Sequence, residues 1–420
     1  MANKSKIIAG IELGSSKTVT VVAQITSDDA YNESVNIIGV SVSPSKGVKK
    51  GQIVNIEESV ESAISSIEGA ERMAGHNIDS AFVSLGGAHI TSQNSHGVVA
   101  VSGASGEIIT SDVDRVIEAA SAISLPTSRE IVHVLPREFI VDGESGVKDP
   151  IGMSGVRLEV ETHVVTASNA AIKNLSKALS ESGVHIDDMV FTGLAASYSV
   201  LTETEKELGC VLIDIGAGTT SVVAYVDGSL AYSGVIPVGA KNVTNDIAIG
   251  LRVSLETAEK IKLFLSNQKN NKEQKDELDL SSLGITEVSK VSRKTLVEGI
   301  IRPRLNEIFT MVRLELEKIR IINRIPSGAV VTGGGAKTIG ITDSAKRMLS
   351  VPVRIGLPTG VSGLIDDVID PAFSVPIGLL LYGSKLDVAE PSGLKFPMKL
   401  NIKGSGFLHK IIESVKDLLP

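Results

Sequence analysis

The chain has 420 residues, enough for about two or three domains that each bury a sizeable core. Lys and Arg total 41 against 49 Asp and Glu, a net charge of −8, which excludes a strongly basic surface, so no nucleic acid is expected among the partners. With 3% aromatic residues, no Trp and one cysteine, base-stacking platforms and disulfide frameworks are also excluded. Cys210 lies in an apolar run, and we expect it to be a buried small hydrophobic residue in a reducing compartment.

Short β-branched runs alternate with helical patterns along most of the chain, which is typical of α/β layers. The runs predict strands at residues 7–11, 19–23, 81–85, 164–167, 211–215, 221–226 and 329–332. The patterns predict helices at residues 57–74, 112–122, 170–182, 257–265, 302–321 and 343–349. The polar stretch 266–280 is predicted to be a mobile loop. The apolar stretches 7–11 and 373–382 are too short for a signal-peptide core or for the ~20 residues of a membrane span, so a cytoplasmic protein is expected.

Residues 11–19 and 213–221 share one pattern of strand, acid, aliphatic residue, glycine, small residues and strand. Two copies about half a chain apart predict two related lobes, each opening with a hairpin, and a site in the cleft between them. Backbone N–H groups at such glycine-containing tips can converge on a phosphate, although a purely structural turn is the alternative. The candidate phosphate-binding residues are Gly14, Ser15, Ser16 and Lys17 in the first tip, and Gly216, Ala217, Gly218, Thr219 and Thr220 in the second.

A carboxylate precedes each of these tips by two residues. Asp214 could hold Mg²⁺ through water, because Mg²⁺ prefers few carboxylates together with phosphate oxygens. Glu12 could share the metal site, although its longer side chain places the carboxylate differently. Lys17 could reach a phosphate as a point charge.

A third glycine cluster, Gly333, Gly334 and Gly335, follows a predicted strand and precedes a predicted helix. Its amides could bind phosphate or pack against a base or ribose. A P-loop is rejected because Ala336 stands where the glycine before Lys-Thr is required, and the dinucleotide fingerprint also fails. Glu259 and Lys262 lie three residues apart on one predicted helix face, where they could hold ribose hydroxyls and the base edge or simply form a solvated pair.

The C-terminal residues 406–420 predict an amphipathic helix whose large apolar side chains fall within an arc of about 140°. These side chains are Phe407, Leu408, Ile411, Ile412, Val415, Leu418 and Leu419. A docked core helix is one interpretation. The Gly- and Pro-containing residues 387–405, with lysines upstream of the helix, favour a tethered helix that lies in an anionic membrane interface.

These residues together resemble the actin-like ATPase superfamily and, within it, the FtsA family of bacterial division proteins. The superfamily resemblance is carried by residues 10–17, 214–220, 236–239, 332–335 and 353–356. Features similar to FtsA in particular are residues 150–157, residues 197–203 and the amphipathic tail. The resemblance extends over nearly the whole chain.

The resemblance implies an α/β, two-lobed, actin-like (ribonuclease H-like) ATPase fold with an FtsA-type subdomain inserted in the first lobe. The implied division places the first lobe at 1–81, 165–204 and 363–386, and the inserted subdomain at 82–164. It places the second lobe at 205–239 and 301–362, the small upper subdomain at 240–300, a flexible linker at 387–405 and a membrane-targeting helix at 406–420.

The resemblance also implies ATP with Mg²⁺ between the lobes, with Gly239, Glu259, Lys262 and the third glycine cluster among the nucleotide-binding residues. Implied partners are further copies of the chain in a filament, the C-terminal peptide of FtsZ on the upper subdomain, later division proteins, and the anionic cytoplasmic face of the inner membrane at the division septum. Arg293, Arg302 and Arg304 are candidates for contacting the peptide, and ordinary surface arginines are an equally open interpretation.

One stretch departs from superfamily members that hydrolyse ATP well, which usually carry an acid or Gln just before the second phosphate loop. The matching stretch here is Phe191-Thr192-Gly193-Leu194, and Thr192 has no pKa suited to a general base. We therefore expect tight nucleotide binding with at most slow hydrolysis. The alternatives are an FtsA-like pilus-assembly adaptor, which normally lacks such a tail, and a small-molecule kinase or phosphatase of the same fold, for which a catalytic Asp in the cleft is expected.

Overall fold

The computed structural model describes residues 5–27, 33–103, 106–267, 276–281, 284–285, 290–364 and 368–388. Within these ranges the chain divides into two compact units. The first unit combines the described residues up to 93 with those from 167 onward, and the second unit is formed by residues 94–166. The predicted membrane-targeting helix at 406–420 and most of the predicted linker lie outside the described residues. No helix in the described ranges is long and apolar enough to cross a membrane.

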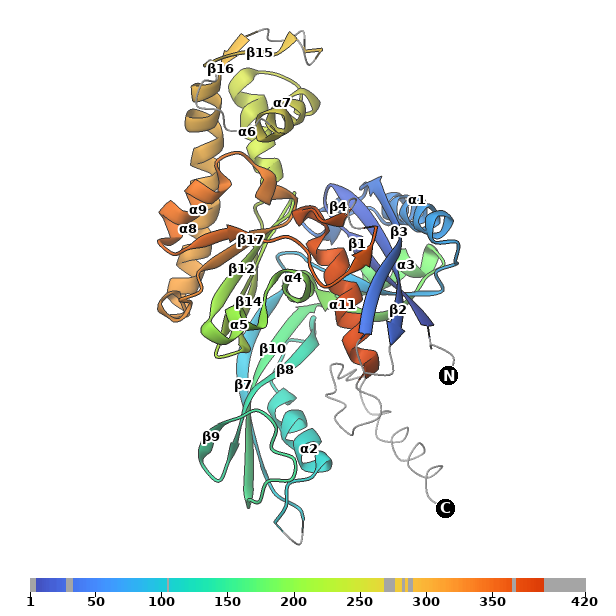
Figure 1. The fold of residues 1–420 in the computed structure, drawn as a ribbon, viewed down its shortest axis with the longest axis vertical. Helices are drawn as coiled ribbons and strands as arrows, with labels where there is room; N and C mark the ends of the chain where they lie inside the picture. Colours follow the sequence, from blue (N-terminus) through green and yellow to red (C-terminus); the bar gives the residue numbers. More distant parts are fainter. Residues whose placement is uncertain are drawn as a thin grey trace. The chain divides into compact units, whose positions relative to one another are not determined.

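Two sheets with the same internal order form the first unit (Figure 1). The first-lobe sheet has the order β11-β6-β1-β2-β3-β19, and the second-lobe sheet has the order β18-β17-β12-β13-β14. In each, two parallel pairs are followed by two antiparallel pairs. The two related lobes expected from the repeated sequence pattern are therefore present.

The strands of these sheets range from two to twelve residues in length. The first-lobe strands are β1 (Ser5–Leu13), β2 (Lys17–Ser27), β3 (Glu33–Pro44), β6 (Ser80–Leu85), β11 (His185–Phe191) and β19 (Ser362–Gly363). The second-lobe strands are β12 (Cys210–Ile215), β13 (Thr220–Val226), β14 (Ser229–Ile236), β17 (Ala329–Thr332) and β18 (Val353–Ile355). A short hairpin, β4 (Val48–Lys49) and β5 (Gln52–Ile53), follows β3. Cys210, at the start of β12, is fully buried as expected.

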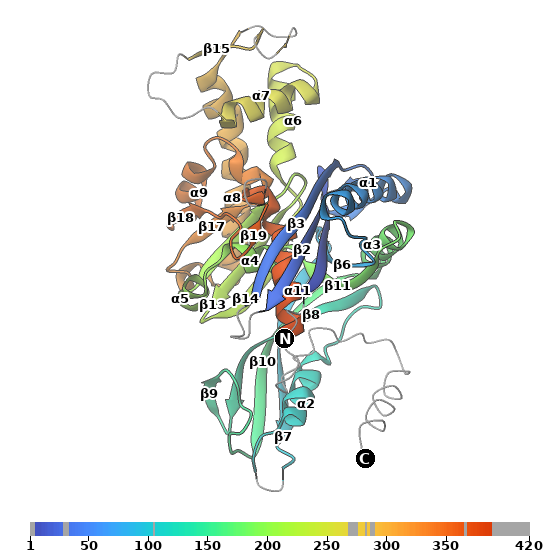
Figure 2. The same cartoon turned by 45° about the vertical axis from the view of Figure 1, so that its right-hand side comes forward.

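Helices cover both faces of the first-lobe sheet. Helices α1 (Ile56–Ala74) and α3 (Asn169–Glu181) lie side by side on one face (Figure 2). Helix α11 (Ser374–Val388) packs on the other face and against α4 (Thr192–Val200). An added Cβ at Gly378 would overlap the carbonyl oxygen of Ala195, so this close crossing of α11 and α4 requires glycine.

One continuous core joins the second-lobe sheet to the helices that follow it in the sequence. These helices are α6 (Ala240–Leu251), α7 (Leu255–Asn267), α8 (Arg302–Lys318) and α9 (Ile341–Leu349). The short helix α5 (Glu203–Leu208) leads into β12, and β15 (Glu277–Asp279) pairs with β16 (Lys290–Ser292) beyond α7. A π-helix at Thr295–Ile301 runs directly into α8.

The second unit is a four-stranded sheet with one helix. Strands β7 (Thr91–Ala100), β8 (Arg129–Val141), β9 (Glu144–Val147) and β10 (Arg157–Ser168) take the order β7-β10-β8-β9. Helix α2 (Thr110–Ser121) supplies apolar side chains to the core of this unit. Asp112 is buried at the start of α2, where burial opposes its ionisation, but hydrogen bonds from Ser102 and the Ile109 amide, with Arg115, hold its pKa at about 2.

The structure corrects several sequence-based element predictions. The loop expected at 266–280 is partly regular, because α7 continues to Asn267 and β15 begins at Glu277, with residues 268–275 outside the described ranges. The helix expected at 302–321 ends at Lys318. Helices α4, α6 and α11 were not predicted. The insertion expected at 82–164 overlaps the second unit, but β6 belongs to the first-lobe sheet because it pairs with β1 and β11.

Candidate functional site

A cavity of about 560 Å³ lies between the two lobes of the first unit. This volume is within the usual range for a small-molecule or cofactor site. Most of the predicted phosphate-binding residues line the cavity: Gly14, Ser15, Ser16, Lys17, Gly216, Ala217, Gly218, Thr219, Gly333, Gly334 and Gly335. The three glycine-containing segments, which are far apart in the sequence, are thus brought to one place.

The two hairpin tips have the same backbone geometry. The Gly14 amide donates to the Lys17 carbonyl at 3.0 Å, and the Gly216 amide donates to the Thr219 carbonyl at 2.9 Å. The tips also approach closely, because an added Cβ at Gly218 would lie 2.9 Å from Ser15 Oγ. The repeated acid-x-Gly pattern therefore encodes two equivalent turns at the ends of β1 and β12.

Like charges are buried together at the base of the cavity. Burial and then the nearby Glu12 raise the pKa of Asp214 to about 7, against the opposing effect of Lys17. Burial likewise raises the pKa of Glu12 despite Lys17, and burial lowers the pKa of Lys17 despite the neighbouring carboxylates. The site therefore carries negative charge that a bound cation would stabilise.

The carboxylates of Glu12 and Asp214 suit a magnesium ion only if other groups complete its coordination. Glu12 and Asp214 both line the cavity, but no group of three or more His, Cys, Asp or Glu side chains is gathered for a metal in the part of the chain that the structure describes. Mg²⁺ is commonly held by one or two carboxylates plus water and phosphate oxygens. The two acids therefore fit a magnesium ion that arrives with a phosphate ligand.

At another wall of the cavity, Glu259 and Lys262 form a network with Thr244. Lys262 Nζ donates to Glu259 Oε2 at 2.7 Å and to Thr244 Oγ1 at 2.9 Å, and the Thr244 hydroxyl donates to the same carboxylate oxygen at 2.5 Å. Lys262 is only 7% exposed, whereas the Glu259 side chain is 43% exposed, so the pair is solvated only at its carboxylate end. The network presents polar atoms beside the apolar side chains of Leu255 and Leu263.

Two predicted residues, Thr220 and Gly239, do not line the cavity. The Thr220 hydroxyl donates to the Val238 carbonyl at 2.8 Å and is fully buried. An added Cβ at Gly239 would lie 2.6 Å from the carbonyl oxygens of both Gly216 and Ala217. Both residues therefore support the second tip from behind rather than facing a ligand.

The three candidate arginines occupy different surroundings. Arg293 and Arg302 line a second cavity, of about 340 Å³, with Asp276, Glu298 and Asp343 also in its wall. Arg304 does not line it. Its Nε and Nη2 donate to the two carboxylate oxygens of Asp246 at 2.6 and 2.9 Å, which fixes Arg304 to α6.

The sequence reasoning missed an ion pair at the edge of the main cavity. Lys337 Nζ lies 2.6 Å from Asp370 Oδ2. Burial opposes ionisation of Asp370, but the hydrogen bonds from Lys337 and from the Ala372 amide lower its pKa. Lys337 lies two positions after the last residue of the third glycine cluster, so its position in the sequence was the available signal. Asp370, 33 positions away, offered none.

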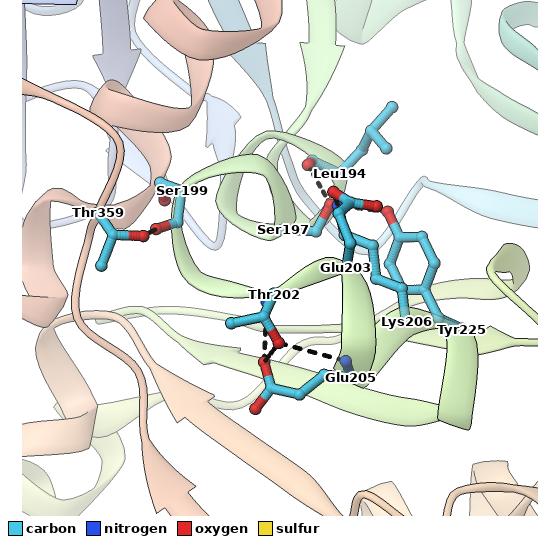
Figure 3. Close-up of polar contacts among 9 residues, drawn as sticks. All are labelled: Leu194, Ser197, Ser199, Thr202, Glu203, Glu205, Lys206, Tyr225 and Thr359. Atoms are coloured by element: carbon cyan, nitrogen blue, oxygen red, sulfur yellow. Dashed lines mark hydrogen bonds and ion pairs between the residues drawn. The ribbon is translucent and has the colours of Figure 1, made fainter.

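The stretch 197–203, at the end of α4 and the start of α5, contacts the second lobe (Figure 3) and α11. The Ser197 hydroxyl lies 2.8 Å from the Tyr225 hydroxyl of β13. The Ser199 hydroxyl donates to the Ser374 carbonyl at 2.6 Å, and the Ser199 carbonyl accepts from the Thr359 hydroxyl at 3.1 Å. These residues therefore hold neighbouring elements together through hydrogen bonds and are not part of the cavity wall.

Duplicated sheets with equivalent hairpin tips around one cavity define the actin-like ATPase fold. Solved structures with this fold align over most of the chain: the PilM-PilN type IV pilus biogenesis complex has a TM-score of 0.64 at 19% identity, covering 90% of this chain and 98% of that chain. MreB 5 of Spiroplasma citri bound to AMPPNP has a TM-score of 0.53 at 15% identity, covering 93% and 99%. At such identities the likeness concerns the fold alone.

Sequence comparison places the chain within that class. Residues 87–166 match the family described as SHS2 domain inserted in FTSA, and residues 211–378 match Cell division protein FtsA. The Cell division protein FtsA of Pseudomonas aeruginosa is 40% identical, covering 90% of this chain and 89% of that protein. The FtsA proteins of Borreliella burgdorferi (42% identical, 90% and 90%) and Bacillus subtilis (37%, 91% and 84%) are similar over comparable lengths. The chain belongs to the FtsA family of cell division proteins.

The raised pKa of Asp214 predicts that replacing its carboxyl group will stabilise the ligand-free protein, and that the gain will depend on pH. Because the folded-state pKa is about 7 against an ordinary 3.8, the protonated acid stabilises the fold at low pH, and this contribution is lost as pH rises from about 4 to 7. Asp214→Asn should therefore raise the free energy of unfolding of the ligand-free protein by about 1–3 kcal/mol at pH 8 and by much less at pH 4.5. Denaturant unfolding at both pH values measures this, with the exposed Asp79→Asn as control. Equal effects at both pH values would contradict the assignment.

Proposed function

We propose that the inter-lobe cavity binds ATP with Mg²⁺. The observation that carries the proposal is the pair of equivalent hairpin tips facing one cavity, each preceded by a carboxylate, the half-buried Glu12 or the buried Asp214. MreB 5 of Spiroplasma citri, which shares the fold, is described in complexes with ADP and with AMPPNP. Nucleotide phosphates would meet the amides of the two tips and the ammonium of Lys17.

In this proposal the cavity residues have separate roles. Asp214 and Glu12 hold Mg²⁺ through water, and the bound metal neutralises phosphate charge. The third glycine cluster lets the nucleotide approach the backbone closely, and Glu259 with Lys262 positions the ribose and base edge. Apolar contact with the base comes from Leu255 and Leu263.

Hydrolysis is proposed to be slow. Thr192 begins α4 and lines the cavity, and its hydroxyl lies 2.9 Å from the Ser221 hydroxyl of the second lobe. A threonine hydroxyl is a poor general base, and positioning the attacking water is much of what phosphoryl transfer asks of a protein.

The hydrolysis proposal predicts a low turnover that improves when a better water-orienting group is supplied. The unaltered chain should hydrolyse Mg-ATP far more slowly than roughly one per second, and Thr192→Gln should raise the rate because its amide can orient water. Phosphate release under saturating Mg-ATP measures both rates, with nucleotide affinity determined separately. A turnover of roughly several per second in the unaltered chain would contradict the proposal.

We further propose that the chain polymerises and anchors FtsZ filaments to the cytoplasmic face of the inner membrane at the division septum, and that it helps to recruit later division proteins. Membership of the FtsA family supports this role. The predicted amphipathic helix at 406–420, outside the described residues, would supply the membrane contact. Half-burying its seven large apolar side chains gives roughly 5–8 kcal/mol before the cost of ordering the helix, so one copy binds weakly and a filament binds firmly.

Sedimentation with anionic vesicles tests the membrane role. The full chain should sediment with the vesicles, and Mg-ATP should increase the bound fraction by promoting assembly. A chain that ends at Gly404 should remain in the supernatant, and neutral vesicles serve as the lipid control. If both chains sediment equally, or neither does, the final helix is a packed structural element and the pilus-adaptor or enzyme alternatives gain support.

For the FtsZ C-terminal peptide we propose the second cavity, lined by Arg293 and Arg302. A π-helix forms one side of this cavity through Val297 and Glu298, and such local irregularities are frequent at functional sites. Its wall carries both positive and negative side chains, which suits a peptide of acidic to mixed charge. Arg304 is not assigned to this peptide site, because it does not line the second cavity and its guanidinium is turned to Asp246 of α6.

The peptide site predicts that Arg302 and Arg313, two arginines of α8, differ in their importance. Both form an ion pair with a glutamate four positions away, Arg302 with Glu298 and Arg313 with Glu317, but only Arg302 lines the cavity. Arg302→Ala should weaken binding of an FtsZ C-terminal peptide roughly tenfold, whereas Arg313→Ala should leave it within about twofold. Fluorescence anisotropy with a labelled peptide measures both. Equal losses in the two variants would contradict this location.

A further inference from the structure

The turn formed by residues 370–373 lies at the main cavity and leads directly into helix α11, whose Val375 also lines the cavity. It is a 3-10 turn over Pro371–Phe373, and Asp370 Oδ1 caps it by accepting a hydrogen bond from the Ala372 amide at 2.9 Å. Pro371 and Ala372 line the cavity, and α11 begins at Ser374, directly after the turn. Any change in this turn therefore reaches both the cavity and the helix.

Lys17 of the first lobe holds the turn from one side. Its Nζ donates to the Ala372 carbonyl at 2.6 Å and lies 4.3 Å from the centroid of the Phe373 ring. Lys17 also lines the cavity beside Ser16. The ammonium that is available to an anion in the cavity is thus already engaged by the turn.

The second lobe holds the same turn from the other side. Lys337 Nζ lies 2.6 Å from Asp370 Oδ2, and the Gly333 amide donates to the Pro371 carbonyl at 3.1 Å. Lys337 and Gly333 line the cavity as well. Two lysines, one from each lobe, therefore face the cavity while bound to one turn.

We take an anion in the cavity to draw the ammonium groups of these two lysines away from the turn. For Lys17 the turn offers a neutral carbonyl and an aromatic ring, which attract an ammonium less strongly than a charged phosphate oxygen does. For Lys337 the competing partner is the Asp370 carboxylate, which carries one negative charge, whereas a phosphate group carries about −1.5 to −2. Competition of this kind is reciprocal. If a bound anion weakens the contacts between the lysines and the turn by a given factor, those contacts weaken the binding of the anion by the same factor.

We infer that Phe373 and Asp370 are positioning residues that set the affinity of the cavity for its phosphate-bearing ligand, acting through Lys17 and Lys337 respectively. Occupation of the cavity in turn loosens the start of α11. The inference rests on the proposed function for the nature of the ligand, a nucleoside phosphate. It goes beyond that function by assigning a role to two residues that need not touch the ligand.

Two substitutions in the full chain test the inference through affinity. Phe373→Leu keeps an apolar side chain but removes the ring from Lys17, and Asp370→Asn keeps the capping oxygen but removes the charge from Lys337. Each should bind Mg-ADP roughly two- to tenfold more tightly than the unaltered chain. The control is Phe139→Leu, a buried aromatic position in the other compact unit, which should leave affinity unchanged.

A residue with a merely structural role would give weaker binding, so unchanged or weaker binding in folded variants overturns the inference. If Phe373→Leu does not fold, Asp370→Asn decides alone.

Hydrogen exchange measured by mass spectrometry gives the second readout and separates the two proposals. In the unaltered chain, saturating Mg-ADP should protect the tips at 14–17 and 216–219 and should increase exchange at the Ala372 and Phe373 amides. In Phe373→Leu the exchange of this turn should already be high without ligand. Protected tips with an unchanged turn overturn the inference and leave nucleotide binding intact. Absence of protection at the tips refutes nucleotide binding in this cavity, and the inference fails with it.

Discussion

The burial of two like charges, Glu12 and Asp214, in one cavity is the constraint on which the first unit depends. Each acid lies near the end of the first strand of its lobe, so the acids face one cavity only because the two lobes are packed together. Burial raises the pKa of both acids, Glu12 raises that of Asp214 further, and Lys17 offsets only part of these effects. The fold therefore holds an electrostatic strain that a metal with its anion would relieve.

The backbone around these acids is tightly packed. Asp214 lies against Gly333, where an added Cβ would overlap its carboxylate, and Gly218 leaves room for Ser15 across the cavity. Tight packing fixes the acids where solvent and side-chain rearrangement cannot disperse their charge. A site arranged in this way favours ligand binding at the cost of stability in the ligand-free state.

The sequence predicted those parts of the fold whose signal is local. The duplicated hairpins were visible because an acid, a glycine and two strands recur at fixed spacing, and α1 was visible because it has one buried and one exposed face. Helices α4 and α11 carry no such period, since both are covered on nearly all sides. In the site, the spacing of Glu259 and Lys262 predicted their contact, whereas Thr244, their shared partner, stands in another helix and left no pattern. The confinement of Arg304 by Asp246, 58 positions away, was equally invisible.

The start of α11 is where these separate features meet. The Ser374 carbonyl accepts a hydrogen bond from Ser199 of the FtsA-like stretch, and the Ser374 hydroxyl lies 2.5 Å from Thr332, which directly precedes the third glycine cluster. The turn just before Ser374 is held by lysines from both lobes. A relative movement of the lobes must therefore strain or release this one residue position. Since interfaces in packed cores change between discrete arrangements more readily than they deform continuously, the state of the cavity and the state of α11 are expected to change together.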